Sequence, residues 1–600
     1  MRLSDYVMAF VAARGVGHVF LVPGGGSMYL VDSLGRNKDL QYVCCLHEQA
    51  CAFAAEAYGE YSNELGVALV TSGPGGTNAV TGVAAAWVES SGCLFISGQA
   101  KRSDLISHRG VRSMGQQETD IVSIVRSITK YAVTIMTPES VRYHLEKAVY
   151  LASTGRHGPV WIDIPLDVQA AEIDEDNLAG FREEADSCCA HTSGPIAGEV
   201  AKVVQAIKQS KRPVFLVGNG IRTARAIPSF YELLNHVRIP VLLTWKAMDI
   251  LPDDHPLYCG RPGGIGQRGA NFTQQNADCL IVIGARLDMP SLAFDHKNFA
   301  RGARKVMVDV DPSEIWKMQT EIEMPICADA GAFVAEFVRQ ADSLRGYSCQ
   351  AWLRRAKDWQ AKYPVVLPEY RREGTDLVST YVFMDVLSDE LVPSDLIVPG
   401  SAGACSDILM QAFRVKHGQR ILNAPGLGAM GTGIPGAMGA CLAAHSRRTI
   451  CVNGDGGFQL NIQELETIQR LNLPIKFFVL NNGGYGSIRA SQESHFQGRL
   501  VGANPASGLT LPDIKKVAHA YGIKTSTIAD NSEIRRVIRS VLAMRGPVVC
   551  EVVVSPDEKT IPRVAATTAP DGRIVSNPME DMSPLLDRDD FAGNMIPPSL

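Results

Sequence analysis

Residues 449–484 have the sequence TICVNGDGGFQLNIQELETIQRLNLPIKFFVLNNGG. Two apolar, β-branched runs, at 449–452 and 475–480, enclose a helical pattern, which predicts a β–α–β unit of a parallel sheet. Each run ends in a polar, glycine-rich turn, at 453–457 and 481–484. In a parallel sheet both turns lie at the carboxyl edge, where α/β proteins bind their ligands.

The two turns carry the groups that a phosphate and a metal ion need. Asp455 and Asn482 offer hard oxygen atoms of the kind that Mg²⁺ or Ca²⁺ prefers. Gly454, Gly456 and Gly457 allow backbone amides to approach a phosphate at the start of the following helix. A strand before each turn makes this pair far more specific than a single GDGG, so we expect a phosphate–metal site here.

The same alternation of short strands and helices recurs along the chain and predicts three doubly wound α/β domains with mainly parallel sheets. The predicted domains are 1–171, 195–345 and 375–555, with linkers at 172–194 and 346–374 and a polar tail at 556–600. The strands are expected at 18–22, 66–71, 93–97 and 160–164, then at 214–217, 280–283 and 305–310, and finally at 396–398, 449–452, 475–480 and 548–553. One helix with Phe458, Ile462, Leu465 and Ile468 on one face is expected after the first turn. The tail is expected to be either a lid over a site or a frayed end.

Composition and charge exclude several classes of function. The 600 residues carry 58 Lys and Arg against 63 Asp and Glu, a net charge of −5. This mildly acidic balance gives no electrostatic indication of binding to nucleic acid or to an anionic membrane. No apolar run of about eighteen residues predicts a membrane span, and Asp5, Arg14 and His18 interrupt any secretory signal. The 14 cysteines form no paired CxxC set, so free thiols are expected. We expect a cytoplasmic enzyme.

The spacing of the two turns resembles the diphosphate–metal motif of thiamine diphosphate (ThDP) enzymes. This resemblance implies that Mg²⁺ is held by Asp455, by Asn482 and by a main-chain oxygen of Gly484, and that the ion offsets the charge of the diphosphate. ThDP and Mg²⁺ are therefore the expected cofactors.

Other phrases resemble the half of the ThDP site that binds the aminopyrimidine ring. Glu48, in HEQA, would by itself be interpreted as a helix cap. The resemblance implies that its carboxyl binds ring nitrogen N1′ and so promotes loss of the thiazolium C2 proton. The loop from Thr71, TSGPGGTN, resembles the one beside this ring. By resemblance, the Gly428 carbonyl accepts a hydrogen bond from the ring, and Met430 forms an apolar wedge between the two cofactor rings.

Longer phrases resemble the large catalytic subunit of acetolactate synthase. They are PGGGSM at 23–28, QET at 117–119, GPVWIDIPLDVQ at 158–169 and GAMGTGIPGAMGA at 428–440. The resemblance implies that Gly25, Gly26 and Gln117 line the reaction space and that the donor is a 2-oxo acid such as pyruvate. It also implies a homo-oligomer whose active sites lie at subunit interfaces, with Glu48 and Asp455 of one site on different subunits.

The chain departs from acetolactate synthases where a second 2-oxo acid would bind. Gln116 stands where Phe is usual, Leu166 where Lys is usual, LDMP at 287–290 where FDDR is usual, and Ser491 where Trp is usual. The missing cations and aromatic wall predict weak selection of pyruvate as the acceptor, because charge-assisted hydrogen bonds to its carboxylate are lost.

A polar segment, 481–497, is expected to be a loop that contacts a hydroxylated or phosphorylated acceptor. The acceptor-site candidates are Gln116, Tyr485, Arg489, Gln492 and His495. With the tail, the pattern resembles acetolactate-synthase-like carboligases of branched-chain deoxysugar (yersiniose-type) biosynthesis, which implies acetyl transfer to a nucleotide-linked ketosugar. Three alternatives stay open: acetolactate synthase itself, a flavin-dependent pyruvate oxidase or decarboxylase, and a catalytically silent ThDP-binding paralogue.

The middle unit resembles the family's central domain, which binds FAD in acetolactate synthase and pyruvate oxidase. Gly218, Gly284, Asp309 and Asp311 lie at predicted strand ends, where a carboxylate is suited to a ribose. The segment at 260–269 matches the flavin loop only loosely. FAD, ADP and an empty domain all remain open.

Overall fold

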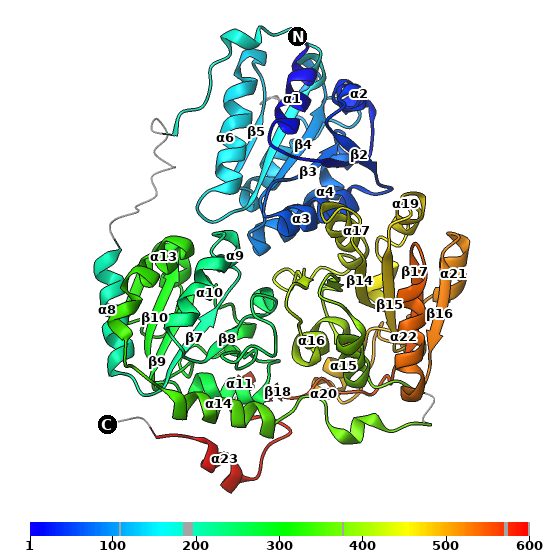
Figure 1. The fold of residues 1–600 in the computed structure, drawn as a ribbon. Helices are drawn as coiled ribbons and strands as arrows, with labels where there is room; N and C mark the ends of the chain where they lie inside the picture. The colour runs from blue at the N-terminus through cyan, green and yellow to red at the C-terminus, as the bar shows by residue number, and fades with distance from the viewer. Residues whose placement is uncertain (107–109, 184–195, 375–376, 569–573, 598–600) are drawn as a thin grey trace.

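The computed structural model describes residues 1–106, 110–183, 196–374, 377–568 and 574–597. Within these residues the chain forms three larger sheets, one in each part of the sequence, whose strands all run parallel to their neighbours. Helices flank each sheet (Figure 1). The predicted fold class, three α/β units with parallel sheets, is confirmed.

The first sheet has the order β2-β1-β3-β4-β6-β5. Its strands are β1 His18–Leu21, β2 Gln41–Cys44, β3 Gly66–Val70, β4 Cys93–Gln99, β5 Tyr131–Thr134 and β6 Pro159–Pro165. The two edge strands, β2 and β5, are absent from the sequence-based prediction. Both are half exposed, so they lack the continuous apolar run that marks a buried parallel strand.

The third sheet repeats this topology, with the order β13-β12-β14-β15-β17-β16. Its strands are β12 Leu396–Pro399, β13 Arg420–Ile421, β14 Thr449–Gly454, β15 Ile475–Asn481, β16 Lys524–Ile528 and β17 Val548–Val553. Strands β14 and β15 pair directly, with Gly454 opposite Leu480. The turns that follow them therefore lie next to each other.

The second sheet has the order β11-β10-β9-β7-β8. Its strands are β7 Pro213–Val217, β8 Val241–Leu243, β9 Cys279–Ile283, β10 Arg304–Asp309 and β11 Met324–Cys327. Helix α14, Gln350–Lys362, falls in the predicted second linker but packs on α11, Arg268–Gln275, with Trp352 and Trp359 buried in the central core.

One apolar cluster is shared by the first and third units, each of which also has a cluster of its own, whereas the central unit has a separate core. Helix α3, Glu48–Ser62, crosses α17, Gly433–Ala443, in the most extensive contact between helices of the two units. A methyl group at Gly439 would lie 2.0 Å from the Ala54 carbonyl oxygen. Glycine and alanine at this crossing therefore allow the two helices to approach closely.

Two local predictions were wrong, one about the segment after the first glycine-rich turn and one about the segment after the second. The single helix expected after the first turn is two short ones, α18 Asp455–Gln459 and α19 Glu464–Arg470, separated at Asn461, which has a φ of 63°. The expected polar loop contains helix α20, Gly486–His495. A mostly exposed helix needs little apolar face, and residues such as Ala490, Gln492 and Glu493 form helices well.

The described part of the tail runs along the central unit (Figure 1). It includes β18 Arg563–Val564, β19 Ala566–Thr568, β20 Ile574–Ser576, β21 Met582–Ser583 and α23 Arg588–Asn594. Arg268 donates to the carbonyls of Met582 and Pro584, and the Trp359 indole donates to Asn594. Among the described residues, none of the helices has the length and apolar character needed to cross a membrane.

Candidate active site

Asp455 links the two glycine-rich turns of the third sheet. It is the first residue of α18, and its carboxylate accepts hydrogen bonds from the backbone N–H groups of Gly456, at 2.8 Å, and Gly484, at 3.0 Å. Burial raises the pKa of this carboxyl to about 6, although the backbone N–H donors oppose the shift. A buried carboxylate held by neutral donors is an environment that a cation would stabilise.

Asn482 lies beside it with an unpartnered oxygen. Its Oδ1 is buried and accepts no hydrogen bond in the described structure. Close packing shapes this turn: a methyl group at Gly484, where φ is 150°, would lie 2.2 Å from the Ala503 carbonyl oxygen. Buried polar atoms normally find partners, so the free oxygen next to Asp455 fits a hard cation such as Mg²⁺.

The described residues contain no group of three or more His, Cys, Asp or Glu side chains placed to hold a metal ion. A metal ion at this turn would therefore need a mixed donor set. The carboxylate of Asp455, the amide oxygen of Asn482 and a main-chain oxygen at Gly484 form such a set, and all three are the oxygen ligands that Mg²⁺ accepts.

The loop that contains Gly428 and Met430 borders this site. A methyl group at Gly456 would lie 2.3 Å from the Tyr485 ring and 3.6 Å from the Met430 methyl carbon. Gly428 has a φ of 65°, a left-handed conformation suited to glycine. Met430 and Tyr485 therefore both lie against the turn at 453–457, which contains Asp455 and is called the metal turn below.

Glu48 belongs to a second cluster, at the carboxyl edge of the first sheet. It begins α3 and is 9% exposed. The amide of Asn78, on helix α4 Pro74–Glu89, donates to Glu48 Oε2 at 3.0 Å. Asn78 is not among the predicted site residues, although it ends the sequence TSGPGGTN at 71–78. Its amide fixes the direction of the Glu48 carboxylate.

The other residues predicted for this half gather around Thr71. The backbone N–H of Gly26 donates to Thr71 Oγ1 at 3.2 Å. Gly25 precedes it in a short 3₁₀ turn. Gln117 has a φ of 64°, and a methyl group at Gly73 would lie 2.8 Å from its carbonyl oxygen. No hydrogen bond or ion pair among the described residues joins Glu48 directly to Asp455.

The acceptor-site candidates have different surroundings. Arg489, on α20, is 9% exposed, and its guanidinium forms no ion pair or hydrogen bond with the described residues. Gln492 instead binds the backbone of Val501 through both amide atoms, at 2.9 and 3.1 Å. His495 and Gln116 are exposed. Only Tyr485 contacts the metal turn directly.

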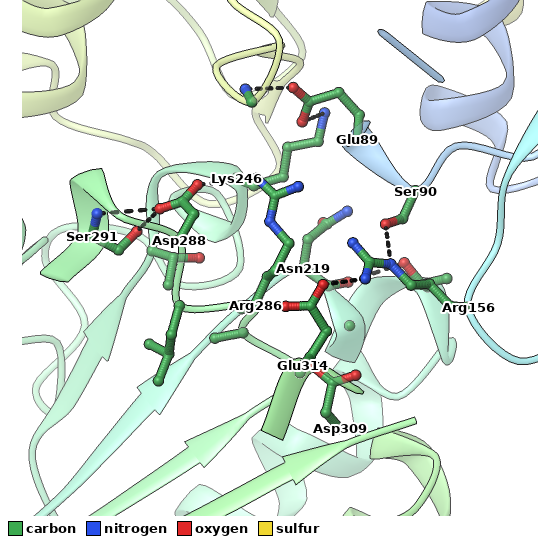
Figure 2. Close-up of a pocket in the computed structure, with 18 of the residues that line it drawn as sticks. Glu89, Ser90, Arg156, Asn219, Lys246, Arg286, Asp288, Ser291, Asp309 and Glu314 are labelled. Carbon is green, nitrogen blue, oxygen red and sulfur yellow. Dashed lines mark hydrogen bonds and ion pairs between the residues drawn. The ribbon is translucent and has the colours of Figure 1, made fainter. Parts of the chain in front are cut away.

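A large cavity opens between the central unit and its neighbours (Figure 2). Its volume is about 1390 Å³ when the open mouth is included. Strand ends of the second sheet line it, namely Gly218–Gly220, Gly284–Asp288 and Asp309. Burial raises the pKa of Asp309 to about 6. The position at the carboxyl ends of the strands is typical of a nucleotide site.

The cations of this cavity are already paired. Arg156 pairs with Asp311 and Glu314, Lys246 with Glu60 and Glu89, and Arg286 with Asp288. A diphosphate bound here would therefore depend mainly on backbone N–H groups, unless these ion pairs rearranged.

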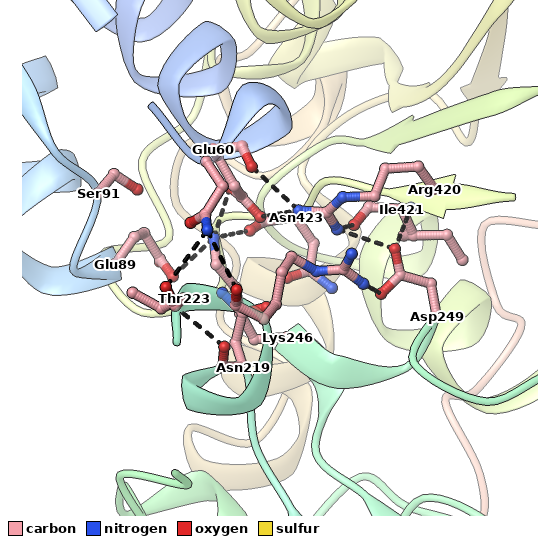
Figure 3. A network of polar contacts seen from close by, with 12 residues as sticks. Glu60, Glu89, Ser91, Asn219, Thr223, Lys246, Asp249, Arg420, Ile421 and Asn423 are labelled. Atoms are coloured by element: carbon pink, nitrogen blue, oxygen red, sulfur yellow. Dashed lines mark hydrogen bonds and ion pairs between the residues drawn. The ribbon is translucent and has the colours of Figure 1, made fainter. Parts of the chain in front are cut away.

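A buried polar network at the back of the cavity joins all three units (Figure 3). Lys246, from the central unit, contacts Glu60 of α3 at 2.8 Å and the Asn423 carbonyl of the third unit at 2.6 Å. Arg420 binds Asp249 at 2.8 Å, and Asp249 also pairs with Arg222. Sequence reasoning did not identify this network.

Comparison with known proteins identifies the family. Three family models of thiamine pyrophosphate (thiamine diphosphate) enzymes match: the N-terminal binding domain at 1–124, the central domain at 200–337 and the C-terminal binding domain at 401–552. The chain therefore belongs to the thiamine pyrophosphate enzyme family, as predicted.

Within this family the chain is an acetolactate-synthase-like enzyme. The acetolactate synthase large subunit of Cyanidium caldarium is 31% identical over 558 residues, which cover 92% of both chains. The probable acetolactate synthase large subunit of Methanocaldococcus jannaschii is 30% identical, over 96% of this chain and 95% of its own. The acetolactate synthase isozyme 2 large subunit of Escherichia coli is 29% identical, over 97% and 100%.

Proposed function

We propose that this enzyme decarboxylates a 2-oxo acid, pyruvate in the first place, and transfers the remaining two-carbon unit to a carbonyl acceptor. One observation carries the proposal. The chain is 31% identical to an acetolactate synthase large subunit over 92% of its residues. It presents a buried glutamate with an orienting amide, Glu48 and Asn78, and a buried carboxylate beside an unpartnered amide oxygen, Asp455 and Asn482.

When bound, ThDP supplies a nucleophilic carbon and an electron sink for the decarboxylation. The chain's own groups prepare that chemistry. Glu48 holds a proton at ring nitrogen N1′, and Asn78 keeps its carboxylate in one direction. Met430 would provide an apolar contact to the cofactor rings from the side of the metal turn. Gly25, Gly26 and Gln117 line the space in which the donor lies.

Asp455, Asn482 and a main-chain oxygen of Gly484 would hold Mg²⁺. Their geometry supports this role, because Asp455 joins the two turns and the Asn482 oxygen is free. Gly454, Gly456 and Gly457 keep the backbone open to the diphosphate at the start of α18.

We propose a nucleotide-linked ketosugar as the acceptor. The sequence departs from acetolactate synthases at 287–290 and Ser491, where a second pyruvate would bind. Arg489 supports an anionic acceptor, because the guanidinium of this largely buried residue has no carboxylate partner among the described residues. Acetolactate synthesis from two pyruvates is the second candidate, and the names of the relatives favour it.

A homo-oligomer with active sites between subunits is part of the proposal. Exposed apolar side chains flank both halves of the site: Leu46 precedes the Glu48 turn, Met28 follows Gly26, Leu460 follows α18 and Ile488 lies on α20. A second copy of the chain that covers these side chains would also bring the Glu48 half of one chain to the Asp455 half of the other.

We further propose that the central cavity takes an adenine nucleotide, either FAD or ADP. The strand-end glycines and the Asp309 carboxyl suit a ribose and a backbone-bound diphosphate. A yellow, bleachable chromophore in the purified protein would favour FAD and would reopen the flavin-dependent alternative. A colourless protein that binds ADP would exclude a resident flavin.

The function is tested with purified protein, ThDP, Mg²⁺ and pyruvate, with and without a nucleotide-linked 4-ketosugar. CO₂ release and product mass are measured. A two-carbon gain on the sugar is expected. Rapid acetolactate formation without the sugar would favour the second candidate, and ThDP binding without CO₂ release under either condition would favour a silent paralogue.

A further inference from the structure

A buried carboxylate of the third unit contacts the turn at 44–48 of the first unit, which leads into helix α3 and is called the Glu48 turn. Glu464, the first residue of α19, is fully buried. Its Oε1 accepts from the backbone N–H groups of Leu46, at 2.9 Å, and His47, at 3.1 Å. These are the two residues that precede Glu48. Its Oε2 accepts from the Thr467 hydroxyl at 2.8 Å.

Neighbours of Glu464 hold the residues on either side of this turn. The Asn461 amide donates to Gln49 Oε1, at 2.9 Å, and to the carbonyl of Gly431, at 3.0 Å. Arg470 donates to the Cys44 carbonyl at 3.0 Å. We call Asn461, Glu464 and Arg470 the brace. The brace contacts the chain before and after Glu48, but among the described residues no hydrogen bond or ion pair joins it to the Glu48 carboxylate itself.

The backbone at this point needs such support. The N–H groups at the start of a helix have no partner within the helix, and His47 satisfies only that of Gln49, through Nδ1. A carboxylate at a helix N-terminus is favourable both as a hydrogen-bond acceptor and toward the helix dipole. Removing it would leave two N–H groups unsatisfied or allow the turn to shift.

We propose that Glu464 is a positioning residue that sets the direction of the Glu48 carboxylate by holding the backbone of residues 46 and 47. This proposal rests on the proposed role of Glu48 in proton transfer. Asn78 fixes the carboxylate end of the Glu48 side chain, whereas Glu464 fixes its backbone end. Helix α19 directly follows α18, the helix that begins at Asp455. The brace therefore connects the metal turn to the Glu48 turn of the same chain.

The experiment compares Glu464→Ala, Glu464→Gln and a control, Glu580→Ala. Glu580 is also a buried carboxylate, but it pairs with Arg301 and Gln275 in the central unit and tail. Three quantities are measured: amide hydrogen exchange of residues 44–52 in cofactor-free protein, affinity for ThDP with Mg²⁺, and the exchange rate of the C2 proton of bound ThDP.

For Glu464→Ala we expect faster amide exchange at 44–52, C2 proton exchange at least about tenfold slower, and a lower kcat with little change in the KM for pyruvate. Glu464→Gln retains an oxygen that accepts both N–H groups, so it should stay within about threefold of the parent. Glu580→Ala should leave C2 exchange unchanged. If Glu464→Ala does not fold, Glu464→Asp, whose shorter side chain cannot reach both N–H groups, replaces it with the same expectations.

Unchanged C2 exchange in the Ala or Asp variant, with Glu48→Gln strongly impaired, would overturn the inference and leave the proposed function intact. A Glu464→Gln variant as slow as Glu464→Ala would also overturn it, because positioning requires only the acceptor oxygen. If Glu48→Gln itself leaves C2 exchange unchanged, the proposed role of Glu48 fails instead.

Discussion

Glu48 and Asp455 are both buried carboxylates at the start of a helix, yet their partners differ. Glu48 has a side-chain amide from another helix, whereas Asp455 has only backbone N–H groups. The first arrangement fixes the direction of a carboxyl, as its proposed contact with one ring atom requires, and the second gives a buried carboxylate that the proposed cation would compensate. The two residues therefore suit different tasks, although the sequence presents both simply as acidic residues beside glycines or alanines.

Replacing Glu48 with Gln should keep the fold and reduce kcat by about 10²-fold or more, because a general acid–base contribution of this size is lost. Steady-state turnover of pyruvate and C2 proton exchange measure the effect. Glu56→Gln is the matched control, since Glu56 lies on the same helix, is buried and accepts a hydrogen bond from Ser91. Carboligation at the parent rate by Glu48→Gln would refute the role proposed for this residue.

Asp455→Ala should reduce the affinity for ThDP in the presence of Mg²⁺ to the value that the parent shows without metal. The measurement is a ThDP titration with and without Mg²⁺. Because the pKa of Asp455 is about 6, protons compete with the metal below that pH, so the parent's Mg²⁺-dependent affinity should fall about tenfold per pH unit there. An Asp455→Ala variant that still responds to Mg²⁺ would contradict the assignment.

At the scale of single elements, strand β6 carries a buried carboxyl with no cation beside it. Asp163 receives hydrogen bonds from Ser97, Gln99 and Thr134, yet burial raises its pKa to about 7. The carboxyl thus binds a proton more tightly in the folded chain than in the unfolded one. The stabilisation that the protonated carboxyl contributes is complete below about pH 4 and is lost as the pH rises through 7.

Asp163→Asn should remove this pH dependence. As the pH rises from 4 to 7, the parent should lose up to about 1.4 kcal/mol of stability per pH unit relative to the variant, with no further change above 7. Calorimetry of the unfolding transition of the parent and the variant at several pH values provides the comparison. Parallel pH profiles for parent and variant would show that Asp163 is already ionised in the folded chain.

The prediction of elements from sequence succeeded where the signal is local. Buried strands such as β9 and β15 are runs of apolar residues, and they were found. The edge strands β2 and β5 were missed because half-exposed strands carry mixed residues. Four further strands were missed: β8 and β13 are only three and two residues long, and β11 and β16 are partly exposed. The break between α18 and α19 was missed because Asn461 adopts its left-handed conformation while bonded to Gln49 and Gly431, which are remote in sequence.

At the scale of the whole molecule, the network around Lys246 joins all three units. Lys246→Met should leave the Glu89 carboxylate buried without its cation and Glu60 with Arg420 at 3.6 Å, at a cost of about 3–5 kcal/mol. Calorimetry should show a lower unfolding midpoint and a central unit that unfolds separately. Lys202→Met, which removes an exposed lysine paired with Glu199, should change neither. A parent-like transition in Lys246→Met would show that other contacts hold the units together.

The sequence by itself determined the three α/β units, the family, and the two glycine-rich turns whose strands lie side by side. These depend on periodicity and short motifs, which are local properties of a chain. Only the tertiary structure decided which groups meet: Asn78 with Glu48, Glu464 with the N–H groups of residues 46 and 47, and Lys246 with Glu60. The physical reason is that a backbone N–H or a buried charge leaves no local pattern that identifies its partner, and most of these partners lie far apart in the sequence.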